Sequence, residues 1–119
     1  MKSIIFLFFC CFSILFTNGQ SHPNINKPDT STKITIVETA CGQCQFGLPG
    51  DGCDLAVRIN GQAYFVDGTS IDEHGDAHSK DGFCNAIRTA EVQGDISENR
   101  FKVSYFKLLP SKPIKETKE

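Results

Sequence analysis

The sequence predicts one small, mostly β domain, and three observations carry that prediction. The first is length, because 119 residues suffice for one domain and not for two. The second is a series of segments in which apolar and polar residues alternate, as they do in half-buried strands. The third is the turn chemistry between these segments, above all Asn60-Gly61, a dipeptide favoured in two-residue hairpin turns.

The first residues have the pattern of a secretory leader. Met1-Lys2 is a short positive start, residues 4–16 are almost entirely apolar, and residues 17–21 are small and polar. The apolar run is shorter than the roughly 20 residues that a membrane-spanning helix needs. We therefore expect cleavage near Gly19 or Gln20, a secreted or periplasmic protein, and no stable membrane span afterwards. A retained N-terminal anchor is the alternative.

The rest of the chain divides by composition. The segment after the leader is polar and contains two prolines, so it cannot bury an apolar face. The formal net charge is −2, which does not resemble the basic surface of a nucleic-acid-binding protein. We expect a signal peptide over 1–19, a disordered tether over 20–32, a β-barrel domain over 33–110 and a charged tail over 111–119.

Alternation predicts five strands, at residues 33–39, 55–59, 62–66, 90–96 and 100–109. In the first hairpin the Asn60-Gly61 turn should place Val57 opposite Tyr64. The second hairpin should turn at residues 97–99. Gly94 lies in mid-strand and predicts a bulge or a sharp bend.

A short helix is predicted over residues 82–89, with Asp81 as its N-cap. Phe83, Cys84 and Ile87 would then share one face. The order of strand, hairpin, helix and hairpin matches the OB-like five-stranded Greek-key barrel, which has one short helix between strands 3 and 4. A small open β-sandwich is the alternative.

Cysteine and histidine gather in two groups, which together predict a site. Cys41 and Cys44 form a Cys-x2-Cys pair at the end of the first strand, and His74 and His78 precede Cys84. Thiolate and imidazole are ligands for zinc and copper. The predicted metal ligands are Cys41, Cys44, His74, His78 and Cys84, with Asp76 orienting an imidazole and Cys53 structural.

Two other uses of the same cysteines remain open. Cys41, Cys44, Cys53 and Cys84 are an even number in a small exported domain, which is typical of two disulfides. Cys41-Gly42-Gln43-Cys44 also resembles the Cys-Gly-x-Cys redox motif, with Cys41 as nucleophile and Cys44 as resolving thiol. The βαβ context of that motif is missing from this sequence, so an enzyme is disfavoured and no catalytic residue is predicted beyond this pair.

The sequence resembles a family of small secreted bacterial proteins known only as a domain of unknown function. The resemblance covers residues 38–109 and is carried by three runs, CGQCQFGLPGDGCDLAVRINGQAYFVDG, DEHGDAHSKDGFCNAIR and AEVQGDI. It implies that these cysteines and histidines are a family pattern, and it brings no known activity. The final hairpin also resembles strands of small bacterial OB-fold proteins.

These observations favour a small exported binding domain with a Cys/His site for Zn or Cu. The alternatives are a disulfide-stabilised domain that binds a small molecule or a protein partner without metal, and a thiol–disulfide redox protein.

Overall fold

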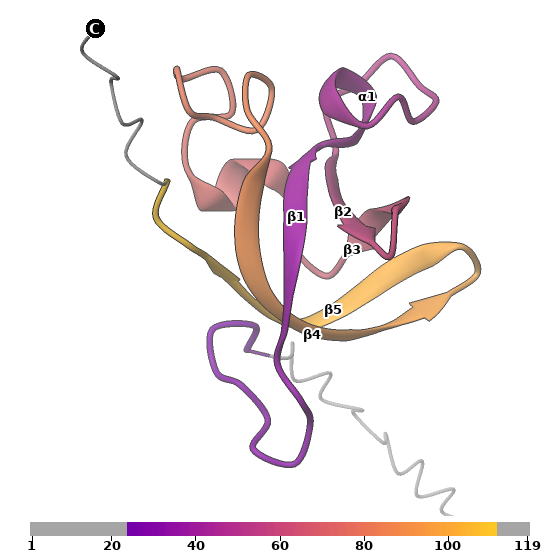
Figure 1. Cartoon of the computed structure of the whole chain (residues 1–119), viewed down its shortest axis with the longest axis vertical. Coiled ribbons are helices and arrows are strands. Elements are labelled where there is room, and N and C mark those ends of the chain that lie inside the picture. The colour runs from indigo at the N-terminus through magenta and orange to yellow at the C-terminus, as the bar shows by residue number, and fades with distance from the viewer. Residues whose placement is uncertain (1–23, 112–119) are drawn as a thin grey trace, which may run out of the picture.

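The structure is a computed structural model that describes residues 24–111, and it shows a five-stranded closed barrel (Figure 1). The barrel is closed in the order β1-β2-β3-β5-β4, with β4 returning to β1. The predicted mostly β barrel is therefore confirmed. Its strands are β1 (Thr35–Cys41), β2 (Leu55–Ile59), β3 (Gln62–Asp67), β4 (Arg88–Ser97) and β5 (Arg100–Leu108).

The β2–β3 hairpin has the predicted turn and register. Asn60 and Gly61 have φ angles of 51° and 82°, the left-handed values that a type I′ turn requires. Val57 lies opposite Tyr64, as expected. The dipeptide thus fixes which side chains of both strands face the core.

The second hairpin turns one residue later than expected. Glu98 and Asn99 both have positive φ, so they form a two-residue turn and Ser97 still pairs with Arg100. The register shifts between Gln93 and Gly94, which confirms the predicted bulge. Beyond this hairpin, β5 runs parallel to β3 and closes the barrel.

The first strand begins and ends two residues later than predicted. Val37, Thr39 and Cys41 point inward and are buried, whereas Ile36 is 65% exposed. The strand continues to Cys41 because Glu38 to Cys41 all pair with β2. The apolar core comprises Val37, Cys41, Leu55, Val57, Val66, Ile71, Ala77, Phe83, Ala90, Val92, Phe101, Val103 and Phe106.

The helix predicted over residues 82–89 is not formed. The Phe83 carbonyl accepts from the Cys41 N–H, and the Cys84 N–H donates to the Ala77 carbonyl. These backbone groups are therefore bonded to other segments, and only one turn closes at Gly82 before β4 begins at Arg88. The short helix between β3 and β4 is instead the 3₁₀ helix η1 (Ile71–His74).

Part of the segment expected to be a tether has specific contacts in the described residues. Gln93 is buried on β4, and its side-chain amide donates to the carbonyls of Asp29 and Thr32 and accepts from the Asp29 N–H. The Phe106 N–H donates to the Ile25 carbonyl. This segment lies beside the lower end of the barrel in Figure 1.

The expected leader and all of the expected tail beyond Ser111 lie outside the described residues. Within residues 24–111, every helix is too short to cross a membrane.

Candidate metal centre

Four cysteines from four segments meet at one end of the barrel. Cys41 ends β1, Cys44 lies in the one-turn helix α1 (Gly42–Gln45), Cys53 precedes β2, and Cys84 lies in the connection to β4. Their Sγ atoms all lie within 4.8 Å of one another, and all four thiols are free. Figure 1 shows α1 and the connection to β4 at the same end of the barrel. We call these four residues the cysteine cluster.

The turn between Cys41 and Cys44 brings both sulfurs to one side. The Cys44 N–H donates to Cys41 Sγ at 3.4 Å, so Cys41 acts as the N-cap of α1. A side chain at residue 42 would not fit, since a Cβ there would lie 2.7 Å from Phe65 Cε1 and 2.9 Å from Leu48 Cδ1. Any larger residue at position 42 would have to displace the Phe65 and Leu48 side chains, which pack against this turn.

Two glutamines of the turn hold the other cysteine segments in place. Gln43 donates to the Asp54 carboxylate at 2.7 Å and accepts from the Asp54 N–H at 2.9 Å, beside Cys53. Gln45 donates to the Cys84 carbonyl at 2.8 Å. Each glutamine thus fixes the backbone of one more cysteine. Side-chain amides of this kind orient ligands without contacting an ion themselves.

The Cys84 segment is fixed by backbone bonds and close packing. Phe83 is fully buried, and its carbonyl accepts from the Cys41 N–H at 3.0 Å. A Cβ on Gly82 would lie 2.4 Å from the carbonyl oxygens of both Asp76 and Ala77. The Asp-Gly-Phe-Cys run therefore has a glycine for close approach, an aromatic anchor and a cysteine of the cluster.

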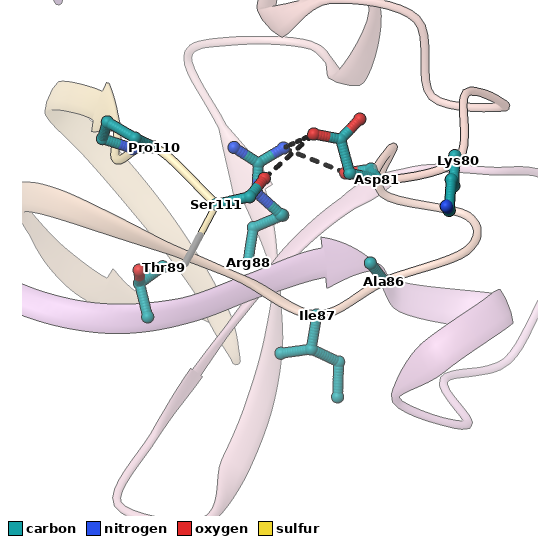
Figure 2. A pocket seen from close by; sticks show the side chains of 8 residues that line it. All are labelled: Lys80, Asp81, Ala86, Ile87, Arg88, Thr89, Pro110 and Ser111. Carbon is teal, nitrogen blue, oxygen red and sulfur yellow. Dashed lines mark hydrogen bonds and ion pairs between the residues drawn. The ribbon is translucent and has the colours of Figure 1, made fainter. Parts of the chain in front are cut away.

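A pocket of about 600 Å³ is lined partly by the same connection (Figure 2). Arg88 donates to the carbonyls of Asp81 and Leu109, each at 2.9 Å, and Ser111 donates to the Asp81 carboxylate. Arg88 thereby ties the connection to the end of β5. Since its guanidinium is already bonded, we assign Arg88 to positioning of this segment.

The cluster favours one thiolate but not several. Burial opposes ionisation of Cys41, yet hydrogen bonds from Cys44 and Cys53 outweigh it and lower the pKa of Cys41. The hydrogen bond to Cys41 raises the pKa of Cys44 to about 11, with burial adding to the effect. Burial, followed by hydrogen bonds with Cys41 and Cys84, raises the pKa of Cys53 far above its ordinary value. A nearby cation would favour the ionised form of the Cys44 and Cys53 thiols.

The predicted histidine ligands lie apart from the cysteine cluster. His74 Nε2 is 2.8 Å from Thr69 Oγ1, and its half-buried ring lies 4.3 Å from the Phe106 ring. His78 is exposed, and its backbone N–H donates to the Asp76 carboxylate at 2.9 Å. Asp76 therefore holds a backbone turn. The structure brings together Cys41, Cys44 and Cys84 of the predicted set.

Sequence reasoning gave Cys53 a structural role, but the structure adds it to the cluster. The even count of four cysteines was the available signal, because four thiolates complete a tetrahedral zinc site by themselves. The roles of Gln43 and Gln45 had no sequence signal, since each depends on where a distant segment folds back.

The donor set fits a soft metal ion. Around one tetrahedral Zn²⁺ with Zn–S bonds of about 2.3 Å, sulfurs lie roughly 3.8 Å apart. The separations in the cluster, all within 4.8 Å, fit that arrangement once Cys53 Sγ and Cys84 Sγ, which are 2.6 Å apart, move away from each other. The cysteine cluster could therefore hold a metal ion.

Comparison with known proteins places the chain in a family. Neither a curated protein nor a solved structure gives a significant match. The model of DUF6370, a family of unknown function, matches residues 35–109, a range that contains all five strands and all four clustered cysteines. This match confirms the resemblance to a family of unknown function, and the chain belongs to DUF6370.

Proposed function

We propose that this protein is an exported domain that binds one Zn²⁺ through Cys41, Cys44, Cys53 and Cys84. The observation that carries the proposal is the position of the four sulfurs, all within 4.8 Å of one another. Cys41 and Cys44 are neighbours in one turn, and the fold brings Cys53 and Cys84 to them. Four thiolates form one of the common donor sets of structural zinc sites.

Electrostatics supports a dication at this point. The metal-free cluster resists a second and a third ionisation, because the pKa values of Cys44 and Cys53 are raised. A bound dication reverses this effect, since it offsets the charge of the thiolates that ligate it. The N–H···S bond from Cys44 adds a fixed donor to Cys41.

The chemistry of this site is structural. Four protein ligands complete a tetrahedral coordination shell, whereas catalytic zinc keeps one position for water or substrate. Zinc would join the ends of β1 and α1 to the segments before β2 and β4. Copper and iron–sulfur clusters are also suited to thiolate ligands, and a set of four sulfurs favours zinc over copper.

The proposal is tested by metal content and thiol count on the same sample. The protein carries Cys10→Ser and Cys11→Ser, is reduced without oxygen, and is then reconstituted with Zn²⁺. We expect one ion per chain by elemental analysis, and a large loss of affinity for Cys41→Ser, Cys53→Ser or Cys84→Ser.

His78→Ala is the matched control, and it should bind zinc like the parent protein. The proposal is wrong if the folded protein, with four reduced thiols, binds no metal. Copper bound in preference to zinc would overturn the choice of ion. Two bridges and no metal in the protein as isolated would favour the disulfide-stabilised alternative.

A further inference from the structure

Two of the four clustered cysteines are arranged as a dithiol pair. Cys53 Sγ and Cys84 Sγ are 2.6 Å apart, and 31 residues separate them in the chain. A disulfide between them therefore needs little movement of the two sulfur atoms.

The surroundings of this pair differ from those of Cys41 and Cys44. Cys53 and Cys84 are half-buried and lie in connections between regular elements. Cys41 is fully buried at the end of β1, and its N–H is bonded to Phe83. A reagent from solvent can therefore reach Cys44, Cys53 or Cys84, but not Cys41.

We propose that Cys53 and Cys84 are the redox-active pair of this protein, and that their disulfide and the metal centre are alternative states of the same end of the barrel. The inference rests on the proposed zinc site, because two of the zinc ligands are consumed when the bridge forms. The oxidant is a low-molecular-weight disulfide, such as oxidised glutathione, in keeping with the expected export of the chain.

The reaction is two successive thiol–disulfide exchanges. In the zinc form the ligating thiols are deprotonated. The thiolate of Cys53 or Cys84 attacks the reagent, the S–S bond of the reagent breaks, and one reagent thiol leaves. The other cysteine then attacks the mixed disulfide and releases the second reagent thiol. Two electrons pass from the cysteines to the reagent, whose two sulfurs take up two protons. Starting from the zinc form, Cys41 and Cys44 also take up two protons, and the metal leaves as Zn²⁺.

The experiment follows bridge formation and zinc release together. The zinc-loaded protein, with Cys10→Ser and Cys11→Ser, is treated with oxidised glutathione while a colorimetric chelator reports free zinc. A non-reducing digest is analysed by mass spectrometry at each time. We expect a peptide pair linked through Cys53 and Cys84 to be the main product, and zinc to appear at the same rate.

Two sets of variants sharpen the result. Cys53→Ser and Cys84→Ser should each abolish the linked pair and instead trap glutathione on the remaining cysteine. A Cys41→Ser/Cys44→Ser double variant, assayed without metal and shown to be folded by circular dichroism, should still form the bridge. A main bridge between Cys41 and Cys44, or a bridged protein that retains zinc, would overturn the inference.

These outcomes separate the inference from the function on which it rests. If reduced protein binds no zinc, the proposed function fails even when the bridge forms. If zinc binds but oxidation links other cysteines, the function stands and the inference fails.

Discussion

At the scale of single residues, His74 shows why a histidine beside a cysteine cluster need not be a ligand. Its ring packs against Phe106, and its Nε2 lies within hydrogen-bonding distance of Thr69, which also donates to Glu73. Glu73 in turn accepts from the Ser70 N–H and completes a capping box at η1. His74 thus stabilises the connection between β3 and β4.

The position of His74 predicts a pH dependence of stability. Burial lowers the pKa of His74 below the ordinary value of 6.5, although the Glu73 carboxylate opposes this effect. Below pH 6.5 the unfolded chain therefore binds more protons than the folded protein, and folding loses stability as pH falls from 6.5 towards the folded pKa. Urea unfolding of the zinc-loaded protein between pH 5 and about 8 should show this loss.

The comparison that isolates the effect is between His74→Gln and the parent protein. Both proteins lose zinc in acid. The difference between their pH dependences of stability therefore reports the effect of the His74 imidazole. The variant should have the weaker pH dependence, and His78→Gln should leave it unchanged. Equal slopes for His74→Gln and the parent would contradict this assignment.

Gln45 belongs to the same scale, because its effect passes through one hydrogen bond to the Cys84 carbonyl. Gln45→Ala removes that bond and should lower zinc affinity by about tenfold, the usual lower range for a group that orients a ligand. Competition with a chromogenic chelator measures the affinity. Gln62→Ala, at an exposed position of β3, is the control and should have no effect.

At the scale of elements, the sequence predicted those features that depend only on residues close together in the chain, such as turns and bulges. Asn60-Gly61 was enough for a hairpin with its register, and Gly94 for a bulge. The helix expected over residues 82–89 failed because backbone groups of Phe83 and Cys84 bond to Cys41 and Ala77. Sequence reasoning gave Cys53 only a structural role for the same reason, since its neighbours depend on how Gln43 and Asp54 pair across a glycine-rich loop.

The connection that contains Cys84 should be sensitive to a single methyl group. Gly82→Ala places a Cβ 2.4 Å from two carbonyl oxygens of the backbone, which cannot move independently. We expect a loss of about 1–3 kcal/mol in the free energy of unfolding, together with weaker zinc binding. Gly47→Ala is a useful comparison, because a Cβ there meets no atom within 4 Å and its cost is confined to backbone strain at φ 67°. Similar zinc affinities for both variants would show that close packing at Gly82 does not position Cys84.

At the scale of the whole molecule, the barrel and the proposed metal centre would stabilise different parts of the fold. The strands surround an apolar core that reaches from Val37 to Phe106, whereas the cysteine-bearing connections have little regular structure. A small domain of this kind gains from an added crosslink, because its core is modest. A metal bound at the cysteine cluster would therefore stabilise one end of a barrel whose strand pairing is already complete.

Removal of zinc should loosen that end and leave the strands paired. If free zinc is held near a thousand times Kd, binding contributes about 4 kcal/mol to stability. That is less than the roughly 5–15 kcal/mol typical of a folded domain, so the metal-free reduced protein should remain folded with a lower urea midpoint.

Removal of zinc should also accelerate hydrogen exchange at the amides of Gly42 and Cys84, which donate to the carbonyls of Asp54 and Ala77 beside the cluster. Phe106 lies on β5, and its amide donates to the Ile25 carbonyl. This amide should exchange at a rate set by global stability alone. Complete loss of the β-sheet circular dichroism on chelation would instead mean that the barrel cannot form without its metal, as in zinc fingers.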